Sequence, residues 1–139
     1  MTSMRLRLST VPIALIASLS LSVAACSGIN DPSKNTVVDF SGTLEQFEGD
    51  VFEFDVNKSN GEYWVQLTAL APDTSTGFSI YLGQVVNGLC TPILGQQGSA
   101  RLNQRALSST IQKGHYCIQL FDAGFIPRAQ TYTIRVSHP

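Results

Sequence analysis

The sequence predicts an all-β fold: an antiparallel two-sheet β-sandwich, jelly-roll-like, preceded by a helical signal peptide and a short linker. Apolar and polar residues alternate with a period of two through most of the chain after residue 36, as in strands with one buried face. Glycine, proline and asparagine separate these segments, and none after residue 25 sustains the spacing of a capped amphipathic helix. Short strands punctuated in this way are typical of a sandwich.

The first 25 residues have the order of chemistries of a secretory signal peptide. Arg5 and Arg7 precede a mostly apolar run over residues 8–21, and small residues follow it. That order predicts export from the cytoplasm and removal of residues 1–25. A retained transmembrane helix is the alternative, since residues 8–25 are long enough to span a bilayer. Interspersed serine, threonine and proline residues, and the lack of a basic cluster after residue 26, favour cleavage instead.

The signal peptide ends in Leu21-Ser22-Val23-Ala24-Ala25-Cys26, which resembles the bacterial lipobox. The resemblance implies that the Cys26 thiol takes a diacylglyceryl group, that cleavage falls before Cys26, and that its amine is often acylated, commonly by palmitate. Plain cleavage with a free thiol at Cys26 is the alternative. Residues 26–36 are rich in turn formers and predict a flexible tether. We therefore expect a lipid-anchored protein of the cell envelope, on the periplasmic face of the outer membrane if the organism is Gram-negative.

The chain has three cysteines, and lipidation of Cys26 leaves Cys90 and Cys117. An oxidising compartment favours a disulfide between these two. Metal ligation by the pair is the alternative, but no CxxC motif or histidine cluster accompanies it. Because Cys117 is out of phase with its apolar neighbours, we expect the bridge on the outer face or at an edge, where it holds residues 88–90.

Residues 37–139 are expected to form the β-sandwich domain. Strands with clear alternation are predicted at residues 52–56, 63–69, 78–82, 116–120 and 131–137. Weaker candidates are residues 37–44, 89–94 and 105–111. In the second of the clear strands, alternation places Tyr63, Val65, Leu67 and Ala69 on the core face.

Charge excludes one class of partner and leaves one cofactor open. Without residues 1–25 the acidic residues outnumber the basic ones, so nucleic acid, which needs a basic face, is not expected. Most of the acidic residues lie between residues 39 and 62. They suit solvent-facing strand positions, with a calcium site of loop carboxylates as the alternative. No DxDxDG spacing is present, so we expect no cofactor.

No catalytic motif is present. The sequence lacks GxSxG, HExxH, a Walker loop and GxGxxG. Of the two histidines, His115 is expected at a surface or edge. His138 lies one residue from the C-terminus, where order is commonly lost. The sequence therefore predicts a protein that is not an enzyme, with a hydrolase of unrecognised site as an alternative.

Four segments together resemble the bacterial pre-peptidase C-terminal domain: residues 49–54 (GDVFEF), 64–67 (WVQL), 114–120 (GHYCIQL) and 131–136 (TYTIRV). The resemblance covers most of residues 37–137. It implies a non-catalytic β-sandwich of the kind appended to secreted hydrolases, where it is thought to aid localisation or binding. This chain differs in having a lipobox and a cysteine pair and no peptidase domain.

The candidate binding site is the loop between the last two predicted strands, with Phe125, Ile126 and Arg128 among turn formers. We favour the alternative that Phe125 folds back to cap the core. Trp64 is a second candidate, as a stacking platform for carbohydrate, although packing on its strand is the commoner use. The sequence thus predicts a membrane-anchored, non-catalytic envelope module that binds a protein or a glycan. A structural subunit or spacer of an envelope assembly is the alternative.

Overall fold

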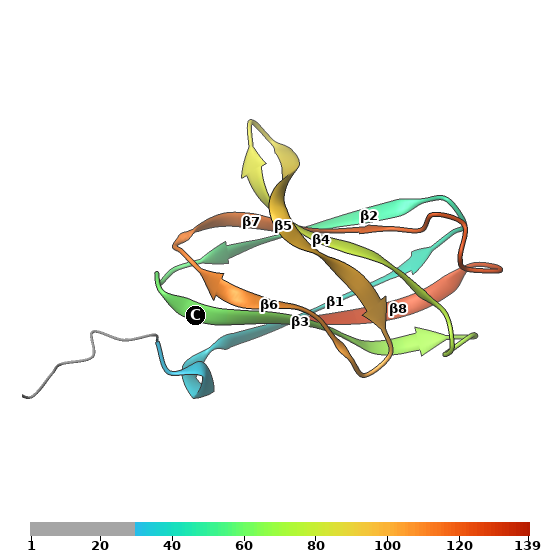
Figure 1. Ribbon diagram of the computed structural model, residues 1–139, viewed down its shortest axis with the longest axis horizontal. Coiled ribbons are helices and arrows are strands. Elements are labelled where there is room, and N and C mark those ends of the chain that lie inside the picture. Colours follow the sequence, from blue (N-terminus) through green and yellow to red (C-terminus); the bar gives the residue numbers. More distant parts are fainter. Residues whose placement is uncertain (1–29) are drawn as a thin grey trace, which may run out of the picture.

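Eight strands form two antiparallel four-stranded sheets that face each other across one core (Figure 1). The computed structural model describes residues 30–139, so the predicted signal peptide and the lipobox with Cys26 lie outside the described residues. The elements are η1 (Pro32–Lys34), β1 (Thr36–Leu44), β2 (Gly49–Val56), β3 (Gly61–Ala71), β4 (Gly77–Val86), β5 (Leu89–Arg101), β6 (Arg105–Ile111), β7 (Gly114–Phe121) and β8 (Gln130–His138). No helix within residues 30–139 has the length and apolar character needed to cross a bilayer.

The strand order confirms the predicted sandwich and its jelly-roll form. One sheet has the order β1-β8-β3-β6 and the other β2-β7-β4-β5. Apart from β4 and β5, successive strands alternate between the two sheets. This interleaving of two Greek keys is the jelly-roll topology. It leaves β4 and β5 as the one local hairpin among these strands.

The core is built from the alternate residues that the sequence placed inward. In β7 and β8 every predicted inward residue is buried: Tyr116, Ile118, Leu120, Tyr132, Ile134 and Val136. Aromatic contacts join the sheets, with Phe40 of β1 stacked on Phe52 of β2 at 4.9 Å between ring centroids. The Tyr132 hydroxyl reaches across to donate a hydrogen bond to the Asp50 carboxylate of β2. Both sheets are therefore held by apolar packing with a polar contact at one edge.

The predicted phase of β3 is wrong at its end. Tyr63, Val65 and Leu67 are buried as expected, but Ala69 is exposed and Leu70 is buried instead. The register between β3 and β8 shifts between Leu67 and Ala69, as in a β-bulge. A bulge adds one residue to one strand, so every later side chain changes face.

Part of the predicted tether belongs to the domain. Asn30 forms a bridge with Gly61 and donates from its backbone N–H to the Asn60 carbonyl at 3.1 Å. The Asn35 side chain donates to the Glu62 carbonyl at 2.8 Å and to the Ser137 hydroxyl at 3.1 Å. The prediction of a flexible tether over residues 26–36 is therefore wrong for residues 30–36, because asparagine side chains bind the backbone of neighbouring strands.

A disulfide joins Cys90 and Cys117 across strand β4, as predicted. Gly83 of β4 pairs with Cys117 of β7 on one side and with Pro92 of β5 on the other. A Cβ atom at Gly83 would lie 2.8 Å from each of the two sulfur atoms. The bridge thus crosses the outer face directly over Gly83, a position that only glycine can occupy without displacement.

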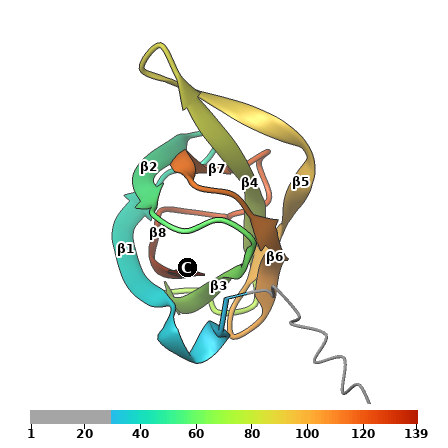
Figure 2. The same ribbon diagram turned by 90° about the vertical axis from the view of Figure 1, so that its left-hand side faces the viewer.

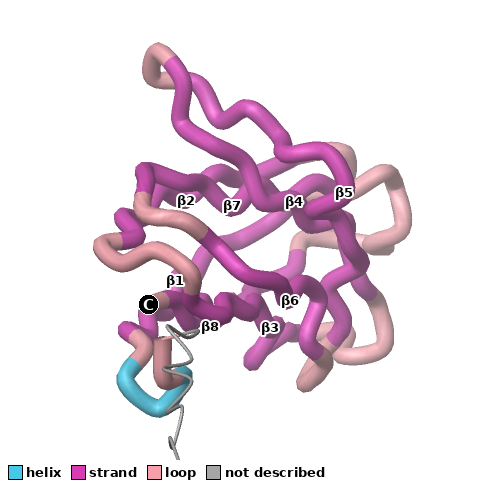
Figure 3. The backbone as a smooth tube through the Cα atoms, turned by 60° about the vertical axis from the view of Figure 1, so that its left-hand side comes forward, coloured by secondary structure: helices cyan, strands magenta, loops and turns pink. Residues whose placement is uncertain are grey.

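Beyond this bridge the β4–β5 hairpin rises out of its sheet as a projecting arm (Figures 1 and 3). We define the arm as residues 83–96, of which Gly83 and Gln84, at the base, still pair with β7. Its tip is the two-residue turn Asn87-Gly88, whose φ angles are 54° and 76°. Two positive φ angles match the type I′ turn, which suits the twist of a hairpin. Nothing in the alternation of residues 89–94 predicted that β5 would run on to Arg101 or that the hairpin would leave the sheet.

We expect the variant Cys90→Ser, Cys117→Ser to lose about 3.5 kcal/mol of free energy of unfolding, because the bridge closes a long loop in the unfolded chain. Urea denaturation of wild type and variant, each with and without reductant, measures the difference. Reductant should shift the wild type toward the variant and leave the variant unchanged. A wild-type midpoint indifferent to reductant would contradict the prediction.

Candidate functional site

The sandwich has two ends with different roles. At the proximal end, Asn30 enters beside Gly61, and the C-terminal Pro139 lies against the same glycine. At the opposite, distal end lie the loops over residues 45–48, 72–76, 102–104 and 122–129 (Figure 1). The predicted binding loop is therefore on the end remote from the point where residues 1–29 join.

Asp122 organises the distal end. Its side chain is fully buried and its carboxylate accepts four backbone hydrogen bonds, from Phe47, Gly124, Phe125 and Ile126, at 2.8 to 3.1 Å. Burial raises the pKa of this carboxyl, but the four N–H donors outweigh burial and hold the pKa below its ordinary value. One ionised side chain thus ties the β7–β8 loop to the β1–β2 turn.

The structure reverses the predicted roles of Phe125 and Ile126. Ile126 is fully buried in the core, whereas Phe125 is 71% exposed. The favoured prediction that Phe125 caps the core is wrong, because the hydrogen bonds to Asp122 orient the loop so that Ile126 turns inward. Phe47, which the sequence analysis did not select, is 65% exposed and packs over Gly124. Two aromatic side chains are therefore displayed on a rigid support.

Phe125 forms one wall of a pocket of about 380 Å³ at the distal end of β4 and β5. The pocket is lined by Ser75, Thr76, Gly77, Phe78, Ser79, Ser99, Arg101 and Phe125. Arg128 is not among these residues. It lies near Asp73, whose pKa is lowered mainly by hydrogen bonds from Ser75 and also by the charge of Arg128. The pocket therefore brings Phe125 together with Arg101, which the sequence analysis missed, and leaves Arg128 outside.

The arm is a second candidate surface. Leu94 is 100% exposed, Leu89 71% and Val86 47%. No Asp, Glu, Lys or Arg occurs anywhere from residue 77 to residue 100. Three extra residues bulge from β5 between its pairings with Tyr81 and Gly83. The uncharged run and the Asn87-Gly88 pair are visible in the sequence, and Asn-Gly is typical of a hairpin turn. Neither feature shows that the hairpin projects from its sheet.

Several contacts hold the base of the arm. The disulfide joins it to β7, and Cys117 is completely buried beneath it. The Tyr63 hydroxyl of the other sheet donates a hydrogen bond to the Gln96 side chain in the bulge. Burial raises the pKa of Tyr63 to about 12, so its hydroxyl keeps the proton that it donates. Figure 2 shows the arm extending well beyond both sheets from this base.

Trp64 lies apart from both surfaces, on the outer face of β3. The Arg105 guanidinium is 5.0 Å from the centre of its ring, and Arg105 also approaches Glu62 at 3.6 Å. A cation over the ring is a stabilising contact in its own right. The structure thus does not bring Trp64 together with Phe125, and Arg105 occupies one side of the proposed stacking platform.

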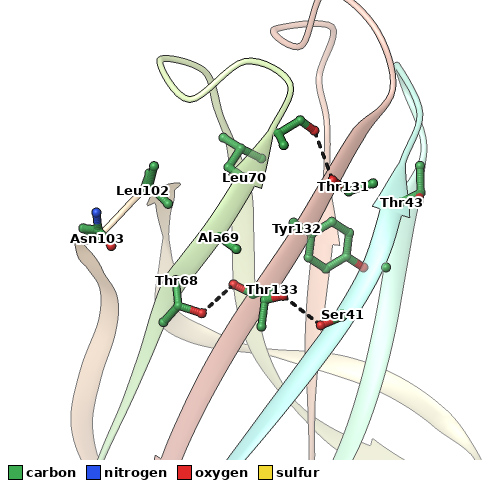
Figure 4. A pocket seen from close by; sticks show the side chains of 12 residues that line it. Ser41, Thr43, Thr68, Ala69, Leu70, Leu102, Asn103, Thr131, Tyr132 and Thr133 are labelled. Carbon is green, nitrogen blue, oxygen red and sulfur yellow. Dashed lines mark hydrogen bonds between the residues drawn. The ribbon is translucent and has the colours of Figure 1, made fainter.

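A wider hollow of about 640 Å³ lies on the outer face of β1, β8 and β3 (Figure 4). Its hydroxyl groups bond within the sheet: Ser41 with the Thr133 hydroxyl at 2.8 Å, and Thr68 to the Thr133 carbonyl at 3.2 Å. Thr131 donates to the Ala71 carbonyl at 3.3 Å. No charged residue lines the hollow. It offers neither an anchor for a ligand nor an exposed aromatic side chain, and we assign it no function.

The histidines do not form a catalytic group with Asp122. His115 is exposed, and its two ring nitrogens lie 2.7 Å from Asp55 and 2.9 Å from Glu53. Hydrogen bonds to Asp55 and then Glu53 raise the pKa of His115. His138 is buried in β8, where burial lowers its pKa, so the expectation that order is lost there is wrong. Among residues 30–139, no three His, Cys, Asp or Glu side chains are grouped as metal ligands would be.

No protein-family model and no curated protein sequence matches the chain. Solved structures that resemble it include PliG, a periplasmic lysozyme inhibitor of g-type lysozyme. The Salmonella Typhimurium protein has 13% identity and a TM-score of 0.42 over 73% of this chain and 89% of its own. PliG from Aeromonas hydrophila has 13% identity and a TM-score of 0.43 over 79% and 92%. A Sulfurospirillum deleyianum protein has 10% identity and a TM-score of 0.42 over 70% and 96%.

We expect Asp122→Asn to lower the free energy of unfolding by about 2 to 4 kcal/mol, because an amide nitrogen would face buried N–H donors. The folded pKa of Asp122 is depressed, so its stabilisation is present above the ordinary pKa of 3.8 and is lost as pH falls through the folded value. Urea denaturation of both proteins from about pH 3 to about pH 7 measures the effect.

Asp73→Asn is the matched control for this prediction. Asp73 accepts its hydrogen bonds from the adjacent Ser75 in an exposed turn, at 2.7 and 3.0 Å. Its replacement should cost less than about 1 kcal/mol at neutral pH. Equal destabilisation by the two substitutions would contradict the organising role of Asp122.

Proposed function

We propose that the mature protein is a lipid-anchored, non-catalytic binding module of the bacterial cell envelope, and that its arm binds an envelope protein. The observation that carries this proposal is the arm itself, an uncharged hairpin that exposes Leu89 and Leu94 on a covalently held base. Exposed apolar surface of this kind is costly in water and is typical of interaction sites.

The chemistry of the arm favours a protein over a glycan. Its exposed aliphatic side chains Val86, Leu89 and Leu94 offer no hydrogen-bond donor or acceptor, whereas a sugar presents hydroxyl groups that need partners. The buried centre of a protein interface, by contrast, is depleted of charged residues. An uncharged stretch from residue 77 to residue 100 therefore matches an apolar groove on another protein.

The rigidity of the arm supports the same function. A two-stranded hairpin alone is marginally stable in water. Here the disulfide fixes one strand of the arm to β7, and the Tyr63 hydrogen bond fixes the bulge. Because the arm is ordered before it binds, association costs less conformational entropy.

The anchor and the lack of catalysis rest on the sequence together with the site. The lipobox at residues 21–26 motivates lipidation of Cys26, and two or more acyl chains suffice for stable anchoring. Both ring nitrogens of His115 face carboxylates, and Asp122 is committed to backbone donors. We also propose that the domain is related to pre-peptidase C-terminal domains, and a relation of this kind agrees with a binding role.

Lipidation is tested by growing cells that express wild type or Cys26→Ala with labelled palmitate. We expect label in the wild-type protein and none in the variant, because the thioether and amide sites are both on Cys26. Absence of label from both proteins would contradict the anchor.

Binding by the arm is tested with a photo-cross-linking residue at position 89, in the full chain and in intact cells. We expect one cross-linked envelope protein, identified by mass spectrometry. Titration of the purified partner should then show Leu89→Ser binding about tenfold more weakly or worse, since central apolar side chains dominate interface energies.

Thr131 is the matched control, because it is exposed on the outer face of the other sheet. A cross-linker there should yield no partner, and Thr131→Ser should bind as the wild type does. A cross-link from position 89 to a second copy of this chain, or to nothing, would contradict the proposal. A partner present in fixed proportion in membranes would identify the module as a subunit of an assembly.

A further inference from the structure

We propose that the distal pocket is a second binding site, independent of the arm, and that it takes a single sugar residue bearing a carboxylate. The pocket lies between the ends of β4 and β5 and the loops over residues 72–76 and 122–129. Its volume of about 380 Å³ is at the small end of the range for small-molecule sites. A ligand of about one ring therefore fits, whereas a folded segment does not.

Two aromatic residues line the pocket, one exposed and one buried. Phe125, which is 71% exposed, and Phe78, which is 1% exposed and packs on Tyr132 in the core, both line the pocket. The backbone N–H of Phe125 donates a hydrogen bond to the Asp122 carboxylate at 2.8 Å, so an ordered loop supports the ring. An aromatic ring with one free face suits the apolar C–H face of a pyranose.

The lining also supplies hydroxyl groups that are free to bind a ligand. Ser79 of β4 and Ser99 of β5 are register partners on the outer face. Neither side chain makes a hydrogen bond within the part of the chain that the structure describes. A hydroxyl group can donate once and accept twice, so this pair matches the hydroxyl groups of a sugar.

Arg101 sets the charge of the ligand. It lines the pocket and forms no ion pair among residues 30–139. Its side-chain stem passes close to Gly77, where a Cβ atom would lie 3.2 Å from the Arg101 Cγ. A guanidinium fork binds a carboxylate through two parallel hydrogen bonds. The free cation beside hydroxyl groups and an aromatic ring therefore points to an acidic sugar.

The test uses the full-length protein in detergent micelles and three probes: D-glucuronate, D-glucose and acetate. Saturation-transfer NMR titrations give the affinity for each probe. We expect glucuronate to bind about tenfold more tightly than glucose, because a hydrogen bond to a charged group adds roughly that factor. Equal binding of glucose, tight binding of acetate at the same site, or no binding of glucuronate would each overturn the proposal.

Variants place the binding in the pocket. Arg101→Gln should weaken glucuronate binding about tenfold and leave glucose unchanged, and Phe125→Ala should weaken both sugars. Arg128→Gln is the matched control, since it removes the same charge from the same end without touching the pocket. Leu89→Ser should not alter sugar binding. An effect of Arg128→Gln as large as that of Arg101→Gln would overturn the site, whatever the fate of the arm.

Discussion

The disulfide over Gly83 is the constraint on which the exposed part of this molecule depends. A hairpin that leaves its sheet loses the packing of one face, and two strands alone hold their shape poorly in water. The Cys90–Cys117 bridge replaces that packing by a covalent link to β7, the strand beyond β4. Glycine at position 83 is needed because the two sulfur atoms occupy the space of a side chain. The apolar arm can therefore project without folding back onto the sandwich.

The distal end is organised by polar contacts instead. The buried Asp122 carboxylate gathers backbone donors from two loops that are far apart in the sequence. It commits Ile126 to the core and leaves Phe125 at the surface. The same molecule thus presents two different chemistries: an uncharged arm with exposed aliphatic side chains, and a pocket with an aromatic ring, hydroxyl groups and Arg101. Each has its own support, so changes to one should leave the other intact.

Most of the fold could be predicted because alternation is a local property. The inward residues of β7 and β8 follow from a period of two, and the pairing of Cys90 with Cys117 was predicted from the expected export and the count of cysteines. The phase of β3 failed at Ala69, since a bulge depends on the partner strand. The order of Asn30 to Asn35 and of His138 depends likewise on neighbours distant in sequence.

The sequence alone determined an all-β sandwich, its strands, its disulfide, the expectation of a lipid anchor at Cys26, and the choice of the loop after β7 as a candidate site. Only the tertiary structure decided that Phe125 faces outward, that Arg101 and not Arg128 accompanies it, and that Leu89 and Leu94 stand on a projecting arm. The physical reason is that alternation specifies which face of a strand is apolar, whereas exposure depends on whether another strand or loop covers that face. Asp122 and the bridge over Gly83 settle that question through contacts that span dozens of residues.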